Sequence, residues 1–180
     1  MTDVPVLVLL GPPGADVVPV AEAVAARLGV DSADTDALVA VRLGASVADV
    51  FVEQGEDAFR AHEREAVRRA LTARAVVALG GGAVQDEATR ADLAALAHEG
   101  VPVVLLEVSM AQAVPRLGFN APRPAGLGNP RQLWSELMDL RRPLYRAVAT
   151  HVVGTDGLSP EQVADEVLAQ TGLDRSGQRG

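Results

Sequence analysis

The chain has 180 residues, the length of one compact α/β domain, which we expect to span residues 1–173 and to be followed by a disordered polar tail over 174–180. Aromatic residues make up 3% and the formal net charge is -8, which argues against nucleic-acid or anionic-membrane binding. The apolar run 4–10 is too short for a signal sequence or a membrane span, and the chain has no cysteine. We therefore expect a cytoplasmic protein that handles small molecules.

The first candidate site follows an apolar run at residues 6–10, which is typical of a strand buried on both faces of a parallel sheet. Gly11 and Gly14 come next, where a phosphate-binding loop of pattern G-x-x-x-x-G-K-[ST] would join a strand to a helix. The last Gly, the Lys and the Ser/Thr of that pattern are replaced by Asp16, Val17 and Val18. All 16 basic residues are arginine, so no lysine elsewhere in the chain can substitute.

These replacements remove the groups that bind nucleotide phosphates. The Lys would reach the β- and γ-phosphates, and the hydroxyl would bind Mg²⁺. A carboxylate about 4 Å from a phosphate oxygen costs on the order of 4 kcal/mol at an effective dielectric near 20, so Asp16 opposes phosphate. We expect Asp16 instead to cap the helix N-terminus as an internal substitute for phosphate, with Pro19 in the first turn and Val17 and Val18 packed nearby.

Strands and helices alternate along the rest of the chain. Strand-like runs occur at 75–79, 101–107 and 150–154, and helical patterns at 20–28, 37–43, 56–71, 87–97, 131–147 and 160–170. This alternation predicts a three-layer, doubly wound α/β fold with a mainly parallel sheet. Ligand sites are then expected in the loops after the strands, at 11–18, 34–36 and 80–82. The Gly- and Pro-rich segment of about 117–130 is predicted to be a lid.

Several motifs follow one another in a specific order. They are Asp34-Thr35-Asp36, Asp49-Val50-Phe51 before Gly55-Glu56, Phe59-Arg60-x-x-Glu63, Leu79-Gly80-Gly81-Gly82-Ala83-Val84, Arg123-Pro124 and Arg141-Arg142-Pro143-Leu144-Tyr145. With this order and spacing, the chain resembles the shikimate kinase family from residue 6 to about residue 170. The resemblance implies a P-loop NTPase fold with a five-stranded sheet and a lid. It also implies the ATP-dependent 3-phosphorylation of shikimate, with ATP and Mg²⁺ as cofactors.

The resemblance assigns an acceptor pocket. Asp36 would bind the shikimate hydroxyls and act in catalysis, while Arg60 and Arg141 would grip the carboxylate, a role that suits planar guanidinium groups. The remaining pocket residues would be Gly80, Gly81 and Gly82, which let the ring approach the backbone, and Phe51 and Phe59 as walls. From the residues alone, Asp36 could be a turn former, Arg60 could lie on a solvated helix face, and the Phe side chains could be core residues.

The resemblance also assigns a donor side. Asp34 would help to hold Mg²⁺ largely through water, although an Asp at this place could equally cap the following helix. Arg116 would contact the nucleotide base, and the lid residue Arg123 would reach the transferring phosphate and act in catalysis. Arg123 is followed by Pro-Ala-Gly rather than the usual Pro-Leu-Leu, so lid closure is expected to differ.

Three functional hypotheses follow. The first is a shikimate kinase-like protein that is inactive or severely impaired in phosphoryl transfer but keeps the binding of shikimate or a related carboxylate. The second is an active shikimate kinase with an atypical P-loop. The third is a structural or regulatory interaction protein, for which the sequence identifies no protein partner.

Overall fold

The structure, a computed structural model, describes residues 4–44, 49, 52–53, 55–117 and 129–173. Five parallel strands form one sheet in the order β2-β3-β1-β4-β5. The strands are β1 (Leu7–Leu10), β2 (Asp31–Asp34), β3 (Ala75–Ala78), β4 (Val103–Glu107) and β5 (His151–Gly154). The predicted doubly wound fold with five strands is confirmed, and every described strand pair is parallel.

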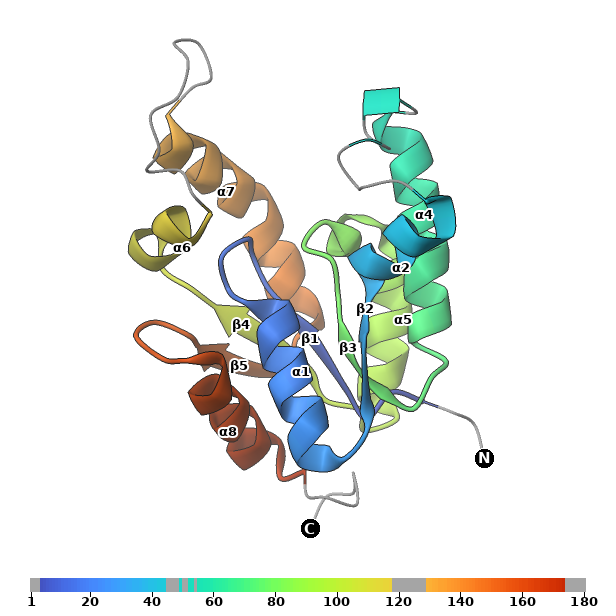
Figure 1. The fold of residues 1–180 in the computed structure, drawn as a ribbon, viewed down its shortest axis with the longest axis vertical. Coiled ribbons are helices and arrows are strands. Elements are labelled where there is room, and N and C mark those ends of the chain that lie inside the picture. The colour runs from blue at the N-terminus through green and yellow to red at the C-terminus, as the bar shows by residue number, and fades with distance from the viewer. Residues whose placement is uncertain (1–3, 45–48, 50–51, 54, 118–128, 174–180) are drawn as a thin grey trace.

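Helices cover both faces of the sheet. They are α1 (Val17–Leu28), α2 (Thr35–Leu43), α4 (Glu56–Ala70), α5 (Glu87–His98), α6 (Met110–Arg116), α7 (Pro130–Val148) and α8 (Pro160–Thr171), with a 3₁₀ turn, η1, over Ala83–Gln85. Figure 1 shows α1 and α8 in front of the sheet and α5 and α7 behind it. Helix α1 begins three residues before the predicted start at Val20, because a proline in the first turn loses no intrahelical hydrogen bond. None of the described helices is long and apolar enough to cross a membrane.

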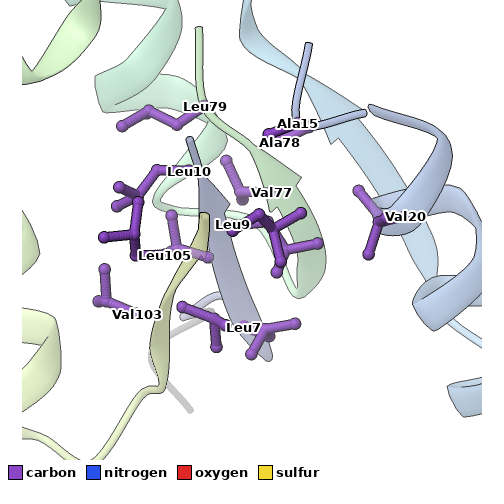
Figure 2. Packing of buried hydrophobic residues seen from close by; sticks show 14 of the residues in the cluster. Leu7, Leu9, Leu10, Ala15, Val20, Val77, Ala78, Leu79, Val103 and Leu105 are labelled. Carbon is purple, nitrogen blue, oxygen red and sulfur yellow. The ribbon is translucent and has the colours of Figure 1, made fainter. Parts of the chain in front are cut away.

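The core surrounds the central strand. All four residues of β1 are buried, with Leu7 and Leu9 completely inaccessible. Figure 2 shows these side chains packed among Val77 of β3, Leu105 of β4 and Val20 of α1. Burying one such aliphatic side chain contributes roughly 1.5–3 kcal/mol. Strand β1 is therefore firmly anchored, and the loop that leaves its carboxyl end starts from a fixed point.

The carboxyl ends of the strands bring three loops together. Figure 1 shows the loop after β1 at the same end of the sheet as the loop after β3. The β2 end, with Asp34, pairs with the β3 end at Ala78. The predicted site residues Phe51 and Arg123, and most of the predicted lid, lie outside the described residues.

Candidate functional site

A cleft of about 350 Å³ lies between the loop after β1 and the ends of β2 and β3. Its charged lining side chains, among the residues that the structure describes, are the carboxylates of Asp16, Asp34 and Asp36. Apolar side chains of Val17 and Val18 also face it. Such a lining repels a polyphosphate, because it offers negative charge and apolar surface where phosphates need cations.

The glycines of the loop are required by close packing. A Cβ on Gly11 would lie 2.7 Å from the Leu106 carbonyl oxygen. Gly14 has φ +89°, and a Cβ there would lie 2.7 Å from the Cα of Ala113 in α6. The loop therefore keeps the compact shape that its glycines allow, even though its phosphate-binding residues are replaced.

Asp16 has a left-handed backbone, with φ 56° and ψ 40°, and is the one non-glycine residue with positive φ among those described. The phosphate-binding pattern has glycine at this position, and Asp16 adopts the left-handed backbone conformation that favours glycine. The prediction that Asp16 caps α1 is wrong: it occupies the N-cap position, but its side chain makes no capping hydrogen bond. Capping side chains usually project from an extended N-cap backbone, which Asp16 lacks.

The Asp16 carboxylate instead pairs with an arginine of α6. Its Oδ2 lies 3.0 Å from Arg116 Nη1, and the same nitrogen donates to the Gly14 carbonyl oxygen at 3.0 Å. The indole of buried Trp134, in α7, donates to the Pro13 carbonyl oxygen at 3.2 Å. Arg116, the predicted contact of the nucleotide base, is thus engaged by the loop itself.

The positions of the missing Lys and Ser/Thr are filled by packing. Val17 and Val18 are half-buried and pack against the main core, as expected. No acidic side chain lies in the first turn of α1, and the described residues contain no group of three or more potential metal ligands. The donor side therefore presents two apolar side chains where the pattern has a lysine and a hydroxyl.

The two aspartates after β2 have different partners. Asp34 Oδ1 accepts the backbone N–H of Asp36 at 2.9 Å and so caps α2, which confirms the structural alternative for this residue. Asp36 Oδ1 is buried and has no hydrogen-bond partner among the described residues. Burial raises the pKa of Asp36, the negative charge of Asp34 raises it further, and the Arg60 guanidinium lowers it. A ligand hydroxyl that donates to Asp36 would satisfy this oxygen.

Gly80 and Thr35 hold Asp36 against the β3 end. The Gly80 N–H donates to the fully buried Thr35 Oγ1 at 2.8 Å. A Cβ on Gly80 would collide with Asp36 Oδ1 and would lie 2.9 Å from its Cγ. Gly80 is therefore needed for the Asp36 carboxylate to lie where it does, a reason beyond the predicted close approach of a ligand.

Arg60 is held by a buried acid rather than left on a solvated face. Its Nη1 donates to Glu63 Oε2 at 2.6 Å, and its Nη2 lies 3.3 Å from Glu56 Oε1. Glu63 is 2% exposed, and burial raises its pKa while Arg60 lowers it. Arg60 also stacks 5.4 Å from the ring centre of Phe59, which is itself buried with Val39 as a core residue.

Arg141 reaches the glycine turn from α7. Its Nη1 donates to the Gly81 carbonyl oxygen at 3.3 Å, and the buried Tyr145 hydroxyl donates to the same oxygen at 2.6 Å. Burial raises the pKa of Tyr145, while the Arg141 guanidinium lowers it. A Cβ on Gly82 would collide with Arg60, so the turn lies between the two arginines.

The structure thus brings Asp36, Arg60, Arg141 and the three glycines together, with Asp34 at the edge. Sequence reasoning quoted Thr35, Glu63 and Tyr145 within motifs but gave them no role. Helical spacing could have revealed two of them, because Glu63 is three residues after Arg60 and Tyr145 is four after Arg141. No local signal indicated that Trp134 contacts the loop.

The matching family model and the curated relatives agree on one family. The family model described as shikimate kinase matches residues 19–171, starting directly after Val18. The shikimate kinase of Thermobifida fusca is 49% identical over 171 residues, covering 94% of this chain and 96% of the relative. That of Streptomyces coelicolor is 47% identical over 165 residues, covering 91% of this chain and 94% of the relative.

Solved structures agree. The shikimate kinase from Acinetobacter baumannii, solved in complex with shikimate, is 29% identical with a TM-score of 0.83, covering 94% of this chain and 93% of that chain. The shikimate kinase from Bacteroides thetaiotaomicron has a TM-score of 0.79 at 23% identity, covering 94% of this chain and 99% of that chain. The second likeness shows the fold, and the first also relates the chain to a protein that binds shikimate.

Proposed function

The chain belongs to the shikimate kinase family, and from that premise we propose that it keeps the recognition of shikimate, or of a closely related cyclic hydroxy acid, but has lost effective handling of ATP and Mg²⁺. The family reaction is the 3-phosphorylation of shikimate. We infer that this chain performs it at a severely reduced rate or not at all.

The observation that carries this proposal is the ion pair between Asp16 and Arg116. Phosphoryl transfer depends on positioning and on neutralising the phosphate charge, and a single well-placed arginine is worth roughly 10³ to 10⁵ in rate. Here Val17 stands at the lysine position of the pattern, and the Arg116 guanidinium is paired with the Asp16 carboxylate of the loop. A polyphosphate would have to break that pair and then lie beside the freed Asp16 charge.

The acceptor side supports the other half of the proposal. Arg60 and Arg141 flank the glycine turn, and each is fixed by a contact that exists without ligand. The buried Oδ1 of Asp36 is available to accept a hydrogen bond from a ligand hydroxyl. We assign carboxylate binding to the two arginines and hydroxyl binding to Asp36. A site prepared in this way loses little side-chain entropy when the ligand binds.

Calorimetric titration with shikimate and, separately, with Mg·ATP tests the proposal. We expect binding of shikimate, no detectable binding of Mg·ATP, and no ADP release above background in a coupled assay. Binding of both ligands with turnover would establish an active kinase with an atypical loop. Binding of neither would favour a structural or regulatory protein.

A matched pair of variants on α7 localises the shikimate site. Arg141→Ala removes the contact to Gly81 and should weaken shikimate binding at least tenfold, as expected for a charge-assisted hydrogen bond. Arg146→Ala removes an arginine that pairs with Glu107 outside the glycine turn and should leave the affinity unchanged. Equal effects of the two substitutions would contradict the assigned site.

A further inference from the structure

Gln85 lies between the two arginines of the acceptor site. It ends the 3₁₀ turn that follows the glycines, and its side chain extends to both guanidinium groups. Because both neighbours are donors, the carboxamide presents its oxygen to them. In that orientation, Oε1 accepts from Arg60 Nη2 at 3.2 Å and from Arg141 Nη2 at 3.1 Å.

The two Nη2 groups differ from the Nη1 groups of the same residues. Nη1 of Arg60 is bound to the buried Glu63, and Nη1 of Arg141 is bound to the Gly81 carbonyl oxygen. These Nη1 contacts fix the direction in which each guanidinium points. The two Nη2 groups then converge on the Gln85 oxygen, and Arg60 Nη2 also lies 3.3 Å from the Oε1 atom of the exposed Glu56 side chain.

A single acceptor oxygen between two guanidinium groups has the geometry of one carboxylate oxygen bound by two arginines. The amide oxygen, however, carries no formal charge. It accepts a hydrogen bond from each arginine without adding negative charge. Arg60 is also paired with the carboxylates of Glu63 and Glu56. Arg141, in contrast, donates to the uncharged Gly81 carbonyl oxygen, so Arg141 supplies the positive charge that favours an anion. Gln85 is also exposed to solvent, so its side chain can move aside without opening the core.

We propose that Gln85 is an internal placeholder for the ligand carboxylate. Its oxygen occupies the point between Arg60 and Arg141 in the ligand-free protein and leaves it when a carboxylate binds. Gln85 then lowers the apparent affinity of the site for carboxylates, because an anion must displace the amide oxygen in order to bind. This inference rests on the proposed function, in which the two arginines bind the carboxylate of a cyclic hydroxy acid.

Two substitutions test the inference by calorimetric titration with shikimate. Gln85→Ala removes the competitor and should tighten binding roughly threefold to tenfold, since a net hydrogen bond is worth about 0.5–1.5 kcal/mol. Gln85→Glu places a true carboxylate between the arginines and should weaken binding at least tenfold. Gln170→Ala is the control, because it removes another exposed glutamine amide, bound to Glu166 on α8. Weaker or unchanged binding in Gln85→Ala would overturn the proposal.

The ligand-free melting temperature gives a second, independent readout. Gln85→Glu should raise it at low salt, because the new carboxylate would pair with the Arg141 guanidinium, which donates to the uncharged Gly81 carbonyl oxygen, and the gain should shrink at high salt. An unchanged or lower melting temperature would overturn the placement of Gln85 between the arginines. If no variant binds shikimate, the proposed function fails, while this comparison still decides the position of Gln85.

Discussion

Restoring the three missing residues of the loop should restore nucleotide binding. The variant combines Asp16→Gly, Val17→Lys and Val18→Ser. Glycine accepts the backbone conformation at φ 56° without strain and frees Arg116 from its ion pair. Lysine supplies the cation for the phosphates, and serine supplies the hydroxyl for Mg²⁺.

The size of the effect follows from the charges. A unit charge about 4 Å from a phosphate oxygen contributes on the order of 4 kcal/mol at an effective dielectric near 20. Removing Asp16 also frees Arg116, an effect in the same direction, but it is not counted in this figure because solvent screens a carboxylate that is 37% exposed. If solvent screens up to half of the lysine contribution, about 2–4 kcal/mol remains. Mg·ATP should then bind roughly 30-fold to 1,000-fold more tightly than to the unchanged protein.

The chain contains its own probe for this experiment. Trp134 is its single tryptophan, and its indole N–H donates to the Pro13 carbonyl oxygen in the loop. Titration with Mg·ATP should therefore change the intrinsic fluorescence of the restored variant, and calorimetry gives the affinity. The matched control combines Val17→Met with the same changes at positions 16 and 18. Methionine has nearly the length of lysine but no charge.

Two results would refute the reasoning about the loop. One is equal Mg·ATP affinity in the Lys and Met variants, which would mean that the missing charge is not the cause of weak binding. The other is tight Mg·ATP binding by the unchanged protein. With shikimate present, the restored variant should also release ADP.

Three further predictions concern the acceptor side. Because the folded-state pKa of Asp36 is raised, ionising this carboxyl costs stability at neutral pH, so Asp36→Asn should raise the melting temperature at pH 7 while weakening shikimate binding. The difference in stability between the two proteins should vanish as pH falls below about 3.9, the ordinary pKa of aspartate. A difference that persists at lower pH would contradict burial as its cause. Gly80→Ala should displace Asp36 and weaken shikimate binding at least tenfold by calorimetry, whereas Gly154→Ala, where a Cβ meets open space, should not. Tyr145→Phe should lower stability to urea by about 0.5–1.5 kcal/mol, because it removes the hydroxyl bound to Gly81, and an unchanged midpoint would contradict that contact.

The fold was largely predictable because its central strands are continuous apolar runs. Strand β2 is the exception. Its sequence Asp-Ser-Ala-Asp contains almost no apolar residue, since it lies at the sheet edge and is partly exposed. Its presence was implied by the family resemblance and not by hydrophobicity. Helix α6 was also missed, because it is short and contains Pro115.

The site was predictable where its contacts are local or part of a motif. The pairing of Asp16 with Arg116 joins residues 100 positions apart, and the contact from Trp134 to Pro13 spans 121 positions. Such contacts depend on the packing of α6 and α7 around the loop, which no local pattern encodes. The capping role predicted for Asp16 failed for a related reason: the backbone angles of a single residue decided where its side chain points.

Helix α7 contacts both halves of the candidate site. Trp134 binds the loop, and Arg141, seven residues later, binds the glycine turn. At a rise of 1.5 Å per residue, about 10 Å of rigid helix separates these two attachment points. The helix therefore acts as a strut that preserves the spacing between the donor and acceptor sides without any nucleotide. Under the proposed function, a loop restored by side-chain replacement would meet an acceptor side that already lies at this spacing.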